Sequence, residues 1–224
     1  MNQLYTLFKS PPDPKYFIFA GKKHSLYLSK GHLSPDADFI WKEWQDASYY
    51  YFNAAPQWQS INNGNWKAIE ETVRKYAYHN RVSLNVFTGT QGQLSVGKLK
   101  VPLSLVPNIN DDNEKSIDLI PIPLHFWKLV YDYKQNAGII FVSVNDPHFH
   151  LDKNELESVS PHYKSLCPKD DPRLCEHKGW NIHNINSKKG YVYCCSVGGF
   201  NEVLSWIPQH ANIPENPIVL SMKL

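Results

Sequence analysis

The residues between positions 30 and 74 include a proton acceptor, oxygen ligands for a metal ion and cations for a phosphate group. They are Lys30, His32, Asn53, Asn62, Glu70 and Arg74. Hydrolysis of a phosphodiester requires a base that activates water and a cation that neutralises the developing negative charge. A histidine titrates near neutral pH and suits the first task. Mg²⁺ suits the second, because it binds few protein oxygens and keeps several waters.

These six residues stand in three blocks with fixed internal spacing. The blocks are Lys30-Gly31-His32-Leu33-x-Pro35-x-x-Asp38-Phe39, Asn53-x-x-Pro56-Gln57 and Asn62-x-x-x-Trp66-x-x-x-Glu70-x-x-x-Arg74. The arrangement resembles the DNA/RNA non-specific endonucleases, in which an Arg-Gly-His loop precedes an Asn-x-x-Pro-Gln strand end and an Asn-x-x-x-Trp-x-x-x-Glu helix start. The resemblance spans about Tyr27 to Ala77 and is greatest to the secreted arthropod branch of the family.

The resemblance implies a ββα-metal fold and a catalytic role for four side chains. His32 would be the general base, and Asn62 would be the sole direct protein ligand of Mg²⁺, with Mn²⁺ as a substitute. Glu70 would hold the water shell of the metal. Asn53 would orient His32 or a bound water.

The resemblance also implies how substrate is bound. Lys30 and Arg74 would contact phosphate oxygens as charged hydrogen-bond donors. The partners would be DNA, RNA or both, held through the phosphate backbone, and cleavage would therefore be largely independent of sequence. The products would carry 5′-phosphate and 3′-hydroxyl ends.

Two departures from the family pattern motivate a second hypothesis. The usual Asp-Arg before Gly-His is Ser29-Lys30 here, and lysine lacks the planar fork with which arginine grips phosphate. Only 31 residues precede His32, fewer than is usual in the family. The alternative is a secreted effector on a degenerate nuclease scaffold, which acts by binding a protein partner or another macromolecule. The joint retention of His32, Asn53, Asn62, Glu70 and Arg74 favours the nuclease.

Hydrophobic periodicity predicts the elements that position these residues. A helix is expected from about Asn65 to Tyr78, because Trp66, Ile69, Val73 and Tyr76 share one face. A short helix is expected over Asn201–Trp206 and a helical turn over Asn154–Ser158. Strands are expected at Tyr16–Ala20, Ser25–Ser29, Ser48–Ala55, Val82–Gly89, His125–Tyr131, Gly138–Val144 and Tyr191–Val197.

The mixed order of these elements predicts an α+β fold, with a central, mostly antiparallel sheet and flanking helices. Residues 1–224 are expected to form a single domain, because the chain is long enough for one substantial core and shows no repeat or linker. Residues 1–15 read as an irregular lead-in, since they contain Pro11-Pro12-Asp13-Pro14.

Several residues have a plain structural interpretation as well as a functional one. Tyr49, Tyr50 and Tyr51 could stack bases, but sheet packing within the predicted strand is favoured. Glu70 and Arg74, four apart on a helix, could form a surface ion pair. Asn65 could cap the helix.

Four cysteines, Cys167, Cys175, Cys194 and Cys195, lie in the C-terminal segment 160–224. Adjacent Cys194 and Cys195 would form a strained ring, so each is expected to bridge to Cys167 or Cys175. Two connectivities remain, and the spacing lacks the paired C-x-x-C of a zinc site. Two disulfides imply an oxidising compartment, and hence secretion.

Net charge, apolar runs and two further motifs mainly exclude functions rather than support one. The formal net charge of +2 is too small to argue for nucleic acid by itself. No apolar run approaches transmembrane length, so no membrane partner is expected, and the first ten residues lack the apolar core of a leader peptide. His148 and His150 lack a third ligand at a fixed spacing, which disfavours a metal site there. Ser187–Gly190 reads as a solvated turn.

Overall fold

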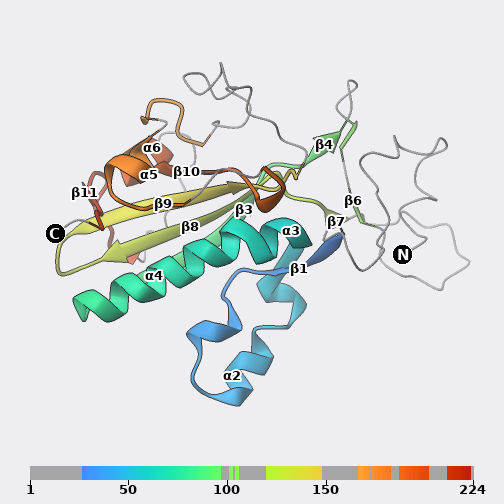
Figure 1. The fold of residues 1–224 in the computed structure, drawn as a ribbon, viewed down its shortest axis with the longest axis horizontal. Coiled ribbons are helices and arrows are strands. Elements are labelled where there is room, and N and C mark those ends of the chain that lie inside the picture. Colours follow the sequence, from blue (N-terminus) through green and yellow to red (C-terminus); the bar gives the residue numbers. More distant parts are fainter. Residues whose placement is uncertain are drawn as a thin grey trace, which may run out of the picture.

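The computed structural model describes residues 27–96, 101–102, 104–105, 120–147, 166–171, 173–182, 187–201 and 211–222. These residues form an α+β structure in which helix α4 runs along the strands of a central, mostly antiparallel sheet, which confirms the predicted fold class (Figure 1). Four sequence predictions lie outside the described residues: the strand Tyr16–Ala20, the lead-in, the turn at Asn154–Ser158, and His148 with His150.

The central sheet has the strand order β10-β9-β8-β3, with β11 paired to β9. The strands are β3 (Asn85–Gln91), β8 (His125–Asp132), β9 (Ala137–Val144), β10 (Val192–Cys195) and β11 (Ile218–Val219). All pairs are antiparallel except β11 with β9. Every residue of β8 and β9 is buried, because the sheet is covered on both faces. The strands predicted at 125–131 and 138–144 are therefore confirmed, each one residue longer.

Side chains of alternate residues along the strands pack into two separate hydrophobic cores, one on each face of the sheet. Phe126 and Val130 of β8 face the first core, where they meet the apolar stripe of α4. Trp127 and Leu129 face the second, which contains Phe200 and lies on the other side of the sheet. This alternation follows from the two-residue period of a strand. It also places Lys128 on the face that α4 covers.

Helix α4 (Lys67–Asn80) continues from α3 (Gln59–Ile61) through a π-helical turn, η4 (Asn62–Trp66), that is kinked at Gly64. The predicted helix is confirmed, but it begins and ends two residues later. The N-cap position of α4 is Trp66 rather than Asn65, and the amide nitrogen of Asn65 donates to the carbonyl oxygen of Gly190 at 2.6 Å. The helix ends at Arg81, whose φ of 51° is left-handed. Val82 then bonds back to Ala77, so β3 begins three residues later than predicted.

A hairpin of β1 (Leu28–His32) and β2 (Ala54–Trp58) pairs His32 with Ala54. Between the strands the chain forms η2 (Asp36–Asp38), α2 (Lys42–Ala47) and η3 (Tyr51–Asn53), and α2 projects away from the central sheet (Figure 1).

Of the strand expected at Ser25–Ser29, the first two residues lie outside the described part, and the described strand runs from Leu28 to His32. The predicted strand Ser48–Ala55 is wrong apart from its last two residues. The physical reason is Asn53, whose side chain bonds to the backbone of Ser34 and Ser48. These bonds close residues 48–53 into turns and prevent them from pairing as a strand.

The disulfides join Cys167 to Cys195 and Cys175 to Cys194. Each bridge links one of the adjacent cysteines to an earlier one, as expected. Neighbouring residues of a strand point to opposite faces, so Cys194 enters the core under α4 while Cys195 enters the other core.

The remaining elements are short. They are α5 (Leu174–His177), α6 (Val197–Asn201), η5 (Ser187–Lys189) and the paired strands β4 (Ser95–Val96) with β5 (Val101–Pro102) and β6 (Ser104–Leu105) with β7 (Ile120–Pro121). The helix predicted at Asn201–Trp206 begins four residues earlier, and residues 202–210 lie outside the description. No described helix is both long and apolar enough to cross a bilayer.

Candidate active site

The hairpin with the loop between its strands, the turn η4 and helix α4 together carry all six predicted site residues. His32 ends β1, Asn53 immediately precedes β2, and Asn62 begins η4. Glu70 and Arg74 lie one turn apart on α4. The loop after β1 contacts both groups of residues. Asp36 accepts from the hydroxyl of Tyr49, whose ring contacts His32, and Asp38 pairs with Arg74, one turn from Glu70.

His32 is half-buried, and its Nε2 has no hydrogen-bond partner among the described residues. The ring of Tyr49 meets it edge-on at 4.6 Å between centroids, and the Tyr49 hydroxyl donates to Asp36 at 2.8 Å. Burial lowers the pKa of His32, and Lys30 lowers it further, whereas Asp36 raises it. The imidazole is therefore neutral near pH 7, the form that can accept a proton.

Asn53 fixes the loop that follows His32. Its Oδ1 accepts from the amide of Ser34 at 3.0 Å, while its Nδ2 donates to the carbonyls of Ser34 and Ser48, both at 2.8 Å. Its backbone carbonyl accepts from the amide of Leu33 at 2.9 Å. The side chain thus holds the backbone on the C-terminal side of His32.

Asn62 is anchored through its amide nitrogen, which donates to the hydroxyl of Ser29 at 3.3 Å. That hydroxyl in turn donates to the carbonyl of Gln57 at 3.1 Å, so the hairpin and η4 are tied together at this point. Because the side-chain nitrogen of Asn62 is held by Ser29, its side-chain oxygen Oδ1 is the atom that could bind a metal. One amide oxygen with a nearby carboxylate fits Mg²⁺, which retains most of its water.

A different cluster of metal-ligating residue types does not fit a metal. Among the described residues, Cys167, Asp170 and Cys195 lie within 4.8 Å of one another. Both sulfur atoms are bonded to each other in a disulfide, so neither can act as a thiolate ligand.

Glu70 lies in an unusual electrostatic environment. Burial raises the pKa of Glu70 to about 7; Lys128 and Arg74 lower it, and Asp38 and Asp36 raise it further. A carboxyl group poised near neutral pH can hold water as an acceptor or as a donor. A bound divalent cation would favour the charged form.

Lys128, the strongest cation acting on Glu70, was missed by sequence reasoning. It is buried in β8, and its Nζ donates to the carbonyl of Leu33 at 3.2 Å and to the hydroxyl of Thr88 at 2.8 Å. The ammonium also lies 5.1 Å from the centroid of the Trp66 ring. The sequence did contain a signal for this residue, namely a lysine in the middle of the apolar strand HFWKLVYD. Lysine is rarely buried unless its ammonium is paired with another group.

The two predicted phosphate-binding residues have different surroundings. Lys30 is exposed, and its Nζ lies 4.3 Å from the centroid of the Tyr51 ring. Arg74 is half-buried and pairs with Asp38 of η2 at 2.7 Å. The ion pair between Arg74 and Glu70 that the helical spacing suggested is therefore replaced by a pair across 36 residues of sequence.

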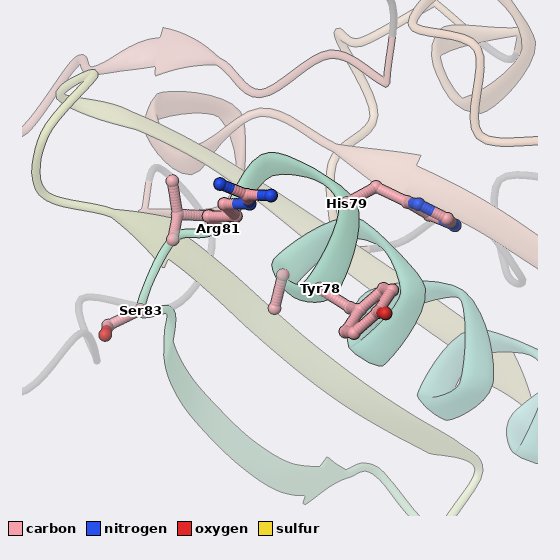
Figure 2. Close-up of a pocket in the computed structure, with 6 residues that line it drawn as sticks. Tyr78, His79, Arg81 and Ser83 are labelled. Carbon is pink, nitrogen blue, oxygen red and sulfur yellow. The ribbon is translucent and has the colours of Figure 1, made fainter.

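A cavity of about 640 Å³ lies at the opposite end of α4 (Figure 2). Its lining includes Tyr78, His79 and Arg81 but no carboxylate and none of the six predicted residues. This cavity therefore lacks the convergent groups that the hairpin and η4 provide.

Residues 8–200 match the model of the family described as DNA/RNA non-specific endonuclease. A salivary endonuclease of Lutzomyia longipalpis is 32% identical over 206 residues, which are 89% of this chain and 44% of that protein. A salivary endonuclease of Culex quinquefasciatus is 34% identical over 82% of this chain and 43% of its own length.

A third relative, the salivary protein Tsal2A of Glossina morsitans morsitans, is 29% identical over 84% of this chain and 43% of its own. The chain thus spans less than half the length of these curated relatives. The family match covers most of the chain, and it includes every residue of the candidate site. This chain belongs to the DNA/RNA non-specific endonuclease family.

Proposed function

We propose that the chain is a secreted, metal-dependent endonuclease that hydrolyses phosphodiester bonds of DNA, RNA or both. The observation that supports the proposal is a neutral His32 whose Nε2 has no hydrogen-bond partner among the described residues. It lies on the hairpin whose Ser29 bonds to Asn62 and whose loop pairs Asp38 with Arg74, one turn from Glu70. Secretion is supported by the two disulfides and by the salivary relatives. The retained site favours catalysis over the binding-only effector.

In this mechanism His32 accepts a proton from the attacking water through Nε2, a buried ring nitrogen that has no hydrogen-bond partner among the described residues and that a water would satisfy. Asn62 and, through water, Glu70 would hold Mg²⁺, or Mn²⁺ in its place. When bound, the metal neutralises charge on the phosphate and on the leaving oxygen. Lys30 binds a phosphate oxygen, and so does Arg74 when it exchanges its contact with Asp38.

Three further residues hold the base in place. Asn53 and Lys128 bind the backbone on the C-terminal side of His32, and Tyr49 limits rotation of its ring. Fixing the base before substrate arrives reduces the reorganisation that the reaction requires.

The test is cleavage of plasmid DNA and of RNA in Mg²⁺, in EDTA, and with a His32→Ala variant. We expect metal-dependent cleavage, and a loss of about 10²- to 10⁴-fold in the variant, which is the usual contribution of a general base. His79→Ala is the matched control, because His79 is exposed on the far end of α4.

Unchanged cleavage by His32→Ala would refute the assignment of the base. Salt-sensitive binding of nucleic acid without turnover, by folded protein in Mg²⁺ or Mn²⁺, would refute the nuclease and support the effector hypothesis.

A further inference from the structure

Three consecutive aromatic side chains of η3 and its N-cap are exposed beside the candidate site. Tyr50 is 62% exposed, Tyr51 77% and Phe52 81%. We call Tyr50, Tyr51 and Phe52 the aromatic shelf. The interpretation that Tyr49, Tyr50 and Tyr51 pack within a sheet is wrong, because the strand begins only at Ala54. Their exposure therefore needs another explanation.

The shelf is continuous with the site. Phe52 directly precedes Asn53, whose side chain is fixed by three hydrogen bonds. Tyr51 lies under the ammonium of Lys30, and Tyr49, which precedes the shelf, contacts the ring of His32. A ligand phosphate that reaches Lys30 therefore also reaches the shelf.

The rings of Tyr50 and Phe52 lie 5.8 Å apart between centroids and are tilted by 35°. The backbone beneath them is closed by a hydrogen bond from the amide of Asn53 to the carbonyl of Tyr50 at 3.0 Å. The rings are thus displayed on an ordered turn, and an aromatic side chain loses little conformational entropy when a flat group stacks on it.

Charge decides which part of a nucleic acid faces the shelf. The neighbouring elements η2 and α2 carry four carboxylates and one lysine; the carboxylates are Asp36, Asp38, Glu43 and Asp46. Two of them are neutralised by ion pairs, Asp38 with Arg74 and Asp46 with Lys42. Asp36 and Glu43 remain to repel a phosphate backbone and also an anionic membrane surface. Phosphates are attracted to Lys30, whose ammonium lies over the ring of Tyr51, so a base next to a bound phosphate can reach the neighbouring rings.

We propose that the aromatic shelf stacks unpaired bases next to the phosphate that is cleaved, so that the enzyme prefers single-stranded or locally opened nucleic acid. The proposal rests on the proposed nuclease function. Bases within a duplex already stack on their neighbours and expose only their edges. An aromatic side chain stacks on the face of a base, which is available when the base is unpaired, and such stacking tolerates any sequence.

The test separates base contacts from phosphate contacts. Binding of two short single-stranded oligonucleotides of equal length, one with bases and one abasic, is measured in EDTA for the wild-type chain and for Phe52→Ala with Tyr50→Ala. We expect the wild type to bind the base-bearing strand about 10-fold more tightly or better. The double variant should bind both strands equally, and its kcat/KM for single strands should fall by a similar factor.

Two variants control for other effects of the substitution. Tyr78→Ala removes an equally exposed ring, at 80%, from the far end of α4 and should keep the preference for bases. Phe52→Trp should also keep it, because a larger ring still stacks. Circular dichroism checks that each variant is folded.

Equal binding of both strands by the wild type would overturn the proposal. So would self-association that the double variant abolishes without any preference for bases, because the shelf would then meet a second copy of the chain. A preference for bases without cleavage would instead refute the nuclease function while the shelf stands.

Discussion

At the scale of single residues, Lys128 connects the backbone that follows His32 with the environment of Glu70. Its ammonium donates to the carbonyl of Leu33. Of the charged groups that lower the pKa of Glu70, this ammonium has the largest effect. Lys128→Met removes both effects while keeping an unbranched apolar chain in the core. We expect kcat/KM to fall about 10- to 100-fold, as for other residues that support metal-binding groups.

Thr88→Val is the control for that experiment, because it removes one partner of the ammonium and keeps the charge. It should lose much less activity than Lys128→Met. Equal losses would mean that the hydrogen-bond network, rather than the buried charge, supports the site.

The same lysine predicts how stability depends on pH. Burial lowers the pKa of Lys128 to about 8 from 10.5. Between these values the unfolded chain binds more protons than the folded one, so the free energy of unfolding contributed by this group rises with pH. Below pH 8 the penalty of burying the charge is fully present. Urea unfolding at several pH values should show this rise in the wild type, and a flatter profile in Lys128→Met would confirm its origin.

At the scale of elements, the turn η4 is the critical joint, because it carries Asn62 and meets η5 closely. A Cβ added to Gly64 would lie 2.6 Å from the carbonyl oxygen of Lys189 and 2.9 Å from its Cα. Both contacts are with backbone, which cannot move aside alone. The glycine is therefore required by the close approach of two segments that are far apart in sequence.

Gly64→Ala should push η4 away from η5 and move Asn62 relative to the hairpin. We expect a loss of about 1–3 kcal/mol in the free energy of unfolding, the usual cost of overpacking. The Mg²⁺ concentration needed for half-maximal cleavage should also rise. Asn63→Ala, an exposed neighbour in the same turn, is the control. Wild-type stability and metal response in Gly64→Ala would show that the contact is not constraining.

At the scale of the whole molecule, the site and the disulfides occupy different parts of the fold. The candidate site is built from the hairpin, η4, α4 and β8, whereas the bridges fasten β10 to residues 167 and 175. Stability and chemistry should therefore be separable.

Replacing Cys175 and Cys194 together by alanine should lower the free energy of unfolding by about 3 kcal/mol, because the bridge closes a loop across a sequence separation of 19. The kcat of the folded variant, measured well below its melting temperature, should match that of the wild type. A fall in kcat without loss of stability would show that the bridge shapes the site.

The sequence by itself determined the elements and the motif. Apolar residues at helical spacing were sufficient for α4, and two uniformly apolar runs were sufficient for β8 and β9. The helical and strand patterns depend only on residues that are close in sequence. The spacing of His32, Asn62 and Glu70 along the chain indicated the family.

Only the tertiary structure decided which distant groups meet. Lys128 bonds to the carbonyl of Leu33, which is 95 residues away in sequence. Arg74 pairs with Asp38 rather than with Glu70, which is closer to it in sequence. The two faces of β10 selected one disulfide connectivity from two. Residues 48–53 became turns because Asn53 bonds to backbone across a loop, which outweighs the strand preference of tyrosine. Each outcome depends on contacts between segments, and a local pattern carries no information about them.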